Sequence, residues 1–245
     1  MSVLVTGGTS GIGLEIALGL AESGRHVFLN YHSNEEAAES AADRVRGVGA
    51  VPHLLKADLG SLEDIRSLSR RIGELASGLD VIVHAAARAV TGRLLDIPGE
   101  ELNRAVATNG SSFVHLVREC QGLLSSGSSV IYVTSKGSER ALKGYGPLGG
   151  PKAMAEQMMR YLATELAPRG VRVNAVSPGP VDTEARRRMF PDTWEQRLRD
   201  QAALTPAGRT LEPGDLAGVI QLMVDPRFSS LIQGQVITID GGLSL

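Results

Sequence analysis

The sequence has little of what marks several common classes of protein. It contains one cysteine, Cys120, so an intrachain disulfide is impossible, and we expect this residue to be buried in the core. Basic and acidic side chains nearly balance, at 25 and 27, which disfavours a nucleic-acid-binding surface. No hydrophobic run approaches the roughly 18 residues that a membrane-spanning helix needs, and no charged leader or signal-type segment opens the chain. We therefore expect a soluble cytoplasmic protein with neither nucleic-acid nor membrane partners.

Hydrophobic residues make up 42% of the chain, enough for a substantial core, although aromatic residues contribute only 4%. Short segments rich in Val, Ile and Leu alternate with longer segments of helical periodicity. This alternation predicts an α/β fold, a single domain over residues 1–245 with a doubly wound, seven-stranded parallel sheet and helices on both faces. The predicted strands are Val3–Thr6, His26–Tyr31, Val51–Lys56, Val81–Ala85, Ser129–Thr134, Arg172–Ser177 and Val236–Ile239. The predicted helices include Glu35–Val48, Ser61–Leu75, Gly99–Leu124 and Pro151–Leu166.

A glycine-rich turn joins the first predicted strand to the first helical segment. Gly7, Gly11 and Gly13 lie in this turn, just before the apolar stretch that starts at Leu14. Glycine allows positive φ and close approach of the backbone to a ligand, and the start of a helix presents free N–H groups to anions. Ligands of such sheets bind beyond the carboxyl ends of the strands. The turn therefore predicts a pyrophosphate cradle, although a plain glycine-rich turn would look similar.

The ends of the next strands favour NADP over NAD. The second strand is followed by Tyr31-His32-Ser33, without the carboxylate that would bind the adenosine ribose and repel a 2′-phosphate. Ser10, His32 and Ser33 could donate to that phosphate, or His32 could be a solvent-facing loop residue. Asp58, after the third strand, could accept from the adenine amino group or cap the following helix. The small residues Ala85–Ala87 after the fourth strand leave room for a nucleotide, and His84 is expected to be a buried core residue.

The order and spacing of these motifs over the whole chain resemble the short-chain dehydrogenase/reductase family. The resemblance implies a Rossmann fold, a nicotinamide cofactor and hydride transfer to or from a carbonyl or an activated alkene. It is carried by Thr6-Gly-Gly-Thr-Ser-Gly-Ile-Gly13, Asp58, Asn109, Ser135, Tyr145 with Lys152, Asn174-Ala-Val-Ser-Pro-Gly179, Thr183 and Asp240-Gly-Gly242. No metal ligands are assigned. The residues expected to contact the cofactor are Gly7, Thr9, Ser10, Gly11, Ile12, Gly13, Tyr31, His32, Ser33, Asp58, Leu59, Ala85, Ala86, Ala87, Tyr145, Lys152, Pro178, Gly179, Val181 and Thr183.

The expected catalytic group combines a phenol, an amine and a hydroxyl. A tyrosine with a pKa near 10 is a poor proton donor unless a neighbouring cation stabilises its phenolate. Lys152 is the predicted cation, and Ser135, with Thr134 as its competitor, is the predicted hydroxyl that orients the substrate oxygen. Ser135 could also be an ordinary serine at a strand end. In the family an asparagine at the position of Asn109 holds a water that relays protons to the lysine, whereas Asn-Gly by itself is compatible with a helix kink or cap.

The spacing of the tyrosine departs from that of most family members. The residue four positions before Lys152 is Leu148, which cannot transfer a proton, and Tyr145 lies seven positions before the lysine. The prolines and glycines of residues 147–151 predict that the helix begins at Pro151 and that Tyr145 lies on the preceding loop. This spacing resembles the enoyl-acyl carrier protein reductase III subgroup, as do Thr205-Pro-Ala-Gly-Arg209 and the residues from Ile232 to Ser244. Tyr145 is the predicted acid, the alternative being a packing or capping tyrosine.

Residues 184–205 correspond to the substrate lid of the family. An apolar channel is expected from Met189, Phe190, Trp194 and Leu198, with the arginines facing solvent or an acidic acyl carrier protein, although a helix pair with an ordinary apolar seam fits the same pattern. The helix Pro151–Leu166 is apolar on more than one side, so one side is expected to meet a second subunit in a homodimer or homotetramer.

The combined reading is an NADPH-dependent reductase that acts on a 3-oxoacyl thioester or a similar polyketide- or fatty-acid-type ketone. An enoyl-thioester reductase would use the same residues, with the phenol stabilising an enolate oxygen. A third hypothesis is a catalytically silent NADP(H)-binding sensor or scaffold, suggested by Leu148 and the altered segment 84–87. Retention of Ser135, Tyr145 and Lys152 together weighs against it.

Overall fold

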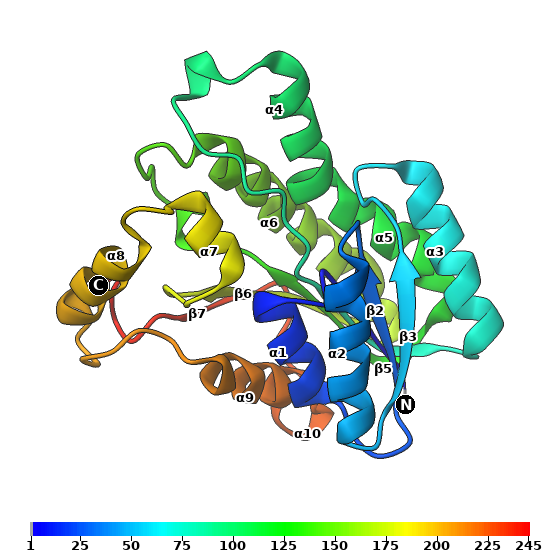
Figure 1. Cartoon of the computed structure of the whole chain (residues 1–245). Coiled ribbons are helices and arrows are strands. Elements are labelled where there is room, and N and C mark those ends of the chain that lie inside the picture. The colour runs from blue at the N-terminus through cyan, green and yellow to red at the C-terminus, as the bar shows by residue number, and fades with distance from the viewer. Residues whose placement is uncertain (1) are drawn as a thin grey trace.

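A seven-stranded parallel sheet forms the middle layer of the protein, with the strand order β3-β2-β1-β4-β5-β6-β7 (Figure 1). The computed structural model describes residues 2–245, apart from the side chains of residues 185, 188, 189 and 213. The strand order reverses beside β1, which pairs with β2 on one side and β4 on the other, as predicted for a doubly wound sheet. The strands are β1 (Ser2–Thr6), β2 (His26–Tyr31), β3 (Val51–Lys56), β4 (Leu79–His84), β5 (Leu124–Val133), β6 (Arg172–Pro178) and β7 (Val236–Ile239).

Helices cover both faces of the sheet, and the alternation of side chains along each strand divides the core between them. On β1, Val3 and Val5 pack with α1, α2 and α9, whereas Leu4 packs with α3, α5 and α6 (Figure 1). Two cores, one on each face, therefore hold the sheet. The helices are α1 (Gly11–Leu20), α2 (Glu35–Gly47), α3 (Leu62–Leu75), α4 (Gly99–Val106), α5 (Ser112–Cys120), α6 (Gly146–Leu166), α7 (Glu184–Met189), α8 (Trp194–Leu204), α9 (Pro213–Val224) and α10 (Pro226–Ser229).

None of the helices among the described residues is both long and apolar enough to cross a membrane. Cys120 is fully buried at the end of α5, as expected, and burial raises the pKa of its thiol to about 11. Gly19 allows α1 to pack closely on α9, because a Cβ at this position would lie 2.6 Å from the Cβ of Ala217.

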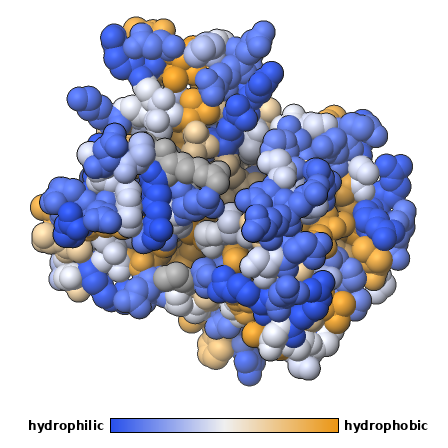
Figure 2. Space-filling view, viewed as in Figure 1, coloured by the Kyte–Doolittle hydropathy of each residue, from blue (hydrophilic) through white to orange (hydrophobic). Residues whose placement is uncertain are grey.

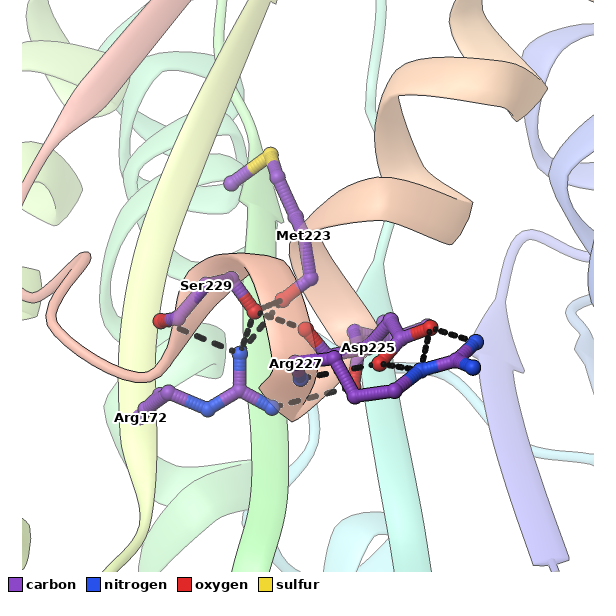
Figure 3. A network of polar contacts seen from close by, with 6 residues as sticks. Arg172, Met223, Asp225, Arg227 and Ser229 are labelled. Carbon is purple, nitrogen blue, oxygen red and sulfur yellow. Dashed lines mark hydrogen bonds and ion pairs between the residues drawn. The ribbon is translucent and has the colours of Figure 1, made fainter.

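A buried arginine joins the start of β6 to the end of α9 (Figure 3). The guanidinium of Arg172 donates to the carbonyl oxygens of Met223, at 2.6 Å, and Val224, at 3.0 Å, and contacts the hydroxyl of Ser229. Asp225 accepts from the backbone N–H of Arg227 at 2.9 Å and thereby caps α10. Carbonyls left free at the end of α9 thus find a charged donor, which fixes the segment leading to β7.

Two predictions of helix boundaries were wrong. The helix predicted over Gly99–Leu124 is divided by a π-helical turn at Ala107–Ser111. The helix predicted to begin at Pro151 begins at Gly146, with Tyr145 at its N-cap. Pro147 lies in the first turn, where a backbone N–H is not needed. Gly149 is necessary there, since a Cβ would lie 2.3 Å from the carbonyl oxygen of Gly137. A close tertiary contact thus explains a glycine that local propensity takes as a helix breaker.

Candidate active site

Three cavities meet at the carboxyl edge of the sheet, with volumes of about 380, 350 and 770 Å³. The first lies beyond β2 and β3. The second lies between the glycine-rich turn and the ends of β5 and β6, and shares Gly7, Ala86 and Ala87 with the first. The third extends from the second toward α7 and α8, and both contain Ser135 and Tyr145. The site predicted from the strand ends is therefore a continuous row of cavities.

The glycine-rich turn has the backbone geometry of an anion cradle. Gly7 has a φ of 60°, and a Cβ on it would lie 2.9 Å from the Cα of Ala86. A Cβ on Gly13 would lie 2.1 Å from the carbonyl oxygen of Gly7. Ser10 is the N-cap of α1 but forms no side-chain cap hydrogen bond, so the first N–H groups of the helix face the second cavity. These residues fit a pyrophosphate group without rearrangement of side chains.

Of the residues predicted to contact the cofactor, all but Thr9 and Ser33 line the first or the second cavity. Thr9 is buried behind the cradle and Ser33 is exposed. The first cavity also contains Arg88 and Arg104, which the sequence analysis did not include. Arg88 directly follows the predicted segment Ala85–Ala87, and this position in the sequence could have identified it as a cavity residue.

Asp58 lies at the wall of the first cavity, and its hydrogen bonds show whether it caps α3. Its side chain accepts from the backbone N–H of Gly60 at 2.8 Å, and the N-cap of α3 is Ser61, which accepts from Asp64. Asp58 therefore closes the turn before α3 and does not cap the helix itself. Its second oxygen lies 3.8 Å from Nε2 of the exposed His32, at the mouth of the cavity.

Ser135 and Tyr145 form a pair of hydroxyl groups where the second and third cavities join. The phenol of Tyr145 donates to Oγ of Ser135 at 3.4 Å. Gly137 makes room for the ring, because a Cβ there would lie 2.3 Å from Cδ1 of Tyr145. Leu148, at the usual position of the tyrosine, is buried and lines the second cavity. The turn at residues 136–138 and the start of α6 thus bring the displaced phenol to Ser135.

Lys152 reaches the same cavity from the second turn of α6. Its Nζ donates to the carbonyl oxygen of Val133 at 2.6 Å, which ties α6 to the end of β5. Burial lowers the pKa of Lys152 to about 8, although the carboxylate of Glu156 raises it. Burial raises the pKa of Tyr145, whereas the hydrogen bond with Ser135 and the charge of Arg186 lower it. Arg186, rather than the predicted Lys152, is thus the cation whose charge lowers the pKa of the Tyr145 phenol.

Glu156 is a buried carboxylate that the sequence analysis missed. It lies one helical turn after Lys152 and accepts hydrogen bonds from the hydroxyls of Thr134 and Ser138. The Ser138 hydroxyl, which has one hydrogen to share between these acceptors, also lies 2.7 Å from the backbone oxygen of Ser135. Glu156 thus contacts a residue before Ser135 in the chain, Thr134, and one after it, Ser138, and fixes the backbone that carries Ser135. The i, i+4 spacing from Lys152 was a signal in the sequence, but such pairs are common on exposed helix faces.

Asn109 and His84 lie beneath the cavities and line neither of the two that hold the predicted cofactor residues. The side chain of Asn109 accepts from the N–H of Arg88 at 2.8 Å and donates to its carbonyl at 2.9 Å, and its own carbonyl accepts from Tyr132 at 2.5 Å. His84 is fully buried and contacts Ser112 at 2.9 Å. Burial, with the charge of Lys152, lowers the pKa of His84 to about 3, which keeps the ring neutral.

The predicted lid forms α7 and α8, which border the third cavity. Phe190 lines it, but Trp194 and Leu198 do not, and the side chain of Met189 lies outside the described residues. Arg186 lines the cavity, whereas these arginines were expected to face solvent or an acidic acyl carrier protein. Arg187 is exposed and pairs with Asp182 at 2.7 Å. Thr183 caps α7 by accepting from the N–H of Arg186 at 3.2 Å, which sets this orientation.

Residues 7–244 match the family described as Enoyl-(Acyl carrier protein) reductase. The sequence is 31% identical over 242 residues to the 1-cyclohexenylcarbonyl-CoA reductase of Streptomyces collinus, and the alignment covers 99% of this chain and 86% of that protein. This chain belongs to the short-chain dehydrogenase/reductase family. The resemblance expected from the sequence motifs is thereby confirmed.

Solved structures of this family confirm the fold. A short-chain dehydrogenase from Burkholderia cenocepacia, in complex with NADP, superposes with a TM-score of 0.89 and is 26% identical, covering 99% of this chain and 97% of that one. A variant of the actinorhodin polyketide ketoreductase with NADPH gives a TM-score of 0.88 and 28% identity, covering 99% and 96% of the two chains. The likeness to both structures extends over 99% of the chain of this short-chain dehydrogenase/reductase.

Proposed function

We propose that this short-chain dehydrogenase/reductase reduces the keto group of a 3-oxoacyl thioester, or a similar polyketide- or fatty-acid-type ketone, with NADPH. The observation that carries the proposal is the hydroxyl pair of Ser135 and Tyr145, 3.4 Å apart, in a cavity shared with Lys152. Two donors at this distance fit a single substrate oxygen between them.

The residues present fit the nicotinamide cofactor. The cradle around Gly7 and Gly13 suits the pyrophosphate, and the first cavity, with Asp58 and Leu59 at its wall, suits the adenosine. The absence of a carboxylate directly after β2 suits a 2′-phosphate near Ser10 and His32, and relatives in the structural comparison were solved with NADP or NADPH. When bound, NADPH supplies the hydride.

The side chains of this protein supply the proton and the electrostatics. Ser135 orients the substrate oxygen, and Tyr145 protonates it. The phenolate left behind is stabilised by the hydrogen bond with Ser135 and by the positive charge of Arg186, and Lys152 lines the same cavity. The cavity that holds these groups is partly covered by α7, which strengthens their interactions by limiting water.

Reduction of an enoyl thioester is the second candidate. It is favoured by the Streptomyces collinus relative, whose name identifies a 1-cyclohexenylcarbonyl-CoA reductase, together with the spacing of Tyr145 and Lys152. In that reaction the same hydroxyl pair would stabilise an enolate oxygen and would not protonate it directly. For either reaction we propose a cytoplasmic enzyme whose thioester is either free or held by an acyl carrier protein.

The two reactions are separated by following NADPH oxidation with a 3-oxoacyl and a trans-2-enoyl thioester of equal chain length. We expect turnover of the 3-oxo substrate and its loss in Tyr145→Phe, with little change in the control Tyr161→Phe, an exposed tyrosine on α6. Turnover of the enoyl substrate alone would establish the second candidate. NADPH binding without turnover of either would support the silent sensor, and activity retained in Tyr145→Phe would refute the assigned acid.

We also propose that copies of the chain associate through α6. Met158 and Tyr161 are 42% and 59% exposed on this helix, and exposed apolar surface of this kind is typical of subunit contacts. Sedimentation velocity should show a dimer or tetramer that Tyr161→Asp weakens; a wild-type monomer would contradict the proposal.

A further inference from the structure

The third cavity is strongly basic. Its described lining includes a single carboxylate, that of Asp240. Six cationic side chains line the same cavity: Arg93, Lys136, Arg140, Lys143, Arg186 and Arg197. A cavity lined mainly by one sign of charge concentrates ligands of the opposite sign.

Only two of these cations have an anionic partner among the described residues. Lys136 pairs with Glu139, and Arg93 lies 3.6 Å from Asp96. Arg140 and Lys143 are exposed at the outer part of the cavity. The other two, Arg186 on α7 and Arg197 on α8, lie together near Phe190.

Arg186 is the cation nearest to the reacting groups. It lines both the second and the third cavity, and it lies close enough to Tyr145 to lower the pKa of the phenol. One of its terminal nitrogens donates to the side-chain oxygen of Gln201, but its Nε is buried and has no described partner. Burial and the charge of Arg197 both lower the pKa of Arg186. A guanidinium that is half-buried beside a second one, with no carboxylate bound, is poised for an anion.

Arg197 completes the pair. Its guanidinium lies 4.1 Å from the centre of the Phe190 ring, and its Nε donates to Oγ of Thr193 at 3.1 Å. Both oxygens of the nearby Asp182 bind Arg187, at 2.9 and 2.7 Å, while its charge raises the pKa of Arg186 without a direct hydrogen bond to it. The surface over α7 and α8 is mainly hydrophilic in the view of Figure 2.

We propose that Arg186 and Arg197 form a carboxylate-binding subsite, so that the substrate carries an acidic group on its acyl portion, a few atoms from the reacting carbonyl. This inference rests on the proposed reductase function and names its substrate class. The position of Arg186 beside Tyr145 places the anion near the reacting oxygen, whereas the phosphates of a carrier arm are separated from the thioester by the length of that arm. The exposed Arg140 and Lys143 are better placed for such phosphates.

The test compares the N-acetylcysteamine thioester of 3-oxoadipate, which has a free carboxylate, with its methyl ester. This carrier has no phosphate, so only the acyl portion differs in charge. We expect kcat/KM to favour the acid by about 10- to 100-fold, the usual effect of a hydrogen bond to a charged group. Arg186→Gln and Arg197→Gln should each abolish most of this preference. The ratio of the two substrates is informative even where a variant lowers all activity.

Arg187→Gln is the matched control, since Arg187 lies on the same short helix but is exposed and paired with Asp182. It should retain the preference of the wild type. Equal use of acid and ester by an active wild-type enzyme would overturn the inference while leaving the proposed function intact. No turnover of either thioester, or of their enoyl counterparts, would instead refute the proposed function. Faster turnover of CoA thioesters than of N-acetylcysteamine thioesters that depends on Arg186, with acid and ester used equally, would assign the subsite to the carrier phosphates and refute the acyl carboxylate.

Discussion

Replacing Glu156 with glutamine should move the alkaline limb of the pH–rate profile to lower pH. Glu156 is a buried carboxylate one turn from Lys152, and its charge raises the pKa of that lysine against the effect of burial, which together give about 8. An opposite charge at this range shifts a pKa by about one unit or more. We expect turnover to need the positively charged ammonium of Lys152, so activity falls as the pH rises through the pKa of this lysine. Removing the negative charge of Glu156 lowers the pKa of Lys152 further, and the limb should move down by about one pH unit.

The assay is kcat/KM for the ketone substrate from pH 6 to pH 10 at saturating NADPH. Glu165→Gln, an exposed change on the same helix, is the control and should leave the profile in place. Both hydroxyls of Thr134 and Ser138 contact the same oxygen of Glu156, Oε1, and the amide oxygen of glutamine can accept from both, so the substitution removes the charge and keeps the acceptor. A normal limb in a folded Glu156→Gln enzyme would refute the electrostatic reasoning, whereas loss of stability alone would leave Glu156 a purely structural role.

Three further results are expected. Lys152→Met should abolish turnover yet stabilise the fold by up to about 3 kcal/mol near pH 7, because burial depresses the pKa of the lysine from 10.5 to about 8. The difference in unfolding free energy, measured by chemical denaturation, should shrink as the pH rises from 8 to 10.5. Unchanged or reduced stability of the variant at pH 7 would contradict this expectation. Gly149→Ala should lower activity and should lower stability by about 1–3 kcal/mol, because its Cβ would meet the carbonyl of Gly137. The control Gly150→Ala, with open space around it, should be neutral. Equal changes of melting temperature in the two variants would disprove this contact. Cys120 should react with a thiol reagent only on unfolding, since burial raises its pKa to about 11, and rapid modification of the native protein would show otherwise.

Much of the architecture follows from local pattern. The bounds of β2, β3 and β7 are those predicted, because short aliphatic runs between polar turns have few alternatives to buried parallel strands. The same pattern located the cavities, since the ends of parallel strands share one edge of the sheet. The start of α6 could not be found in this way. It depends on the contact of Gly149 with Gly137, two residues that come together only in the folded chain.

The chemistry of the site was predictable by residue type but not by partner. One cavity is lined by Ser135, Tyr145 and Lys152, as predicted. The side chain of Asn109, in contrast, forms its hydrogen bonds with the backbone of Arg88. The role of Arg186 depends on the orientation of α7, which the cap at Thr183 sets. The sequence, with three adjacent arginines, could not show which of them lines the cavity. Orientation of this kind is decided by tertiary packing.

The N-cap position of Tyr145 has a consequence for how the enzyme could diversify. A tyrosine placed one turn before the lysine on a helix is bound to it by fixed geometry, so neither residue can be moved without the other. Here the phenol projects from the N-cap of α6, where the carbonyl of Tyr145 accepts from the N–H of Gly149 at 2.8 Å, while Lys152 is anchored on Val133 at the end of β5. Insertions or substitutions in residues 136–144 could therefore re-aim the proton donor toward differently shaped substrates while the amine stays in register. The direction of the phenol can thus be selected or engineered through the loop that packs on its ring, with the backbone of α6 unchanged.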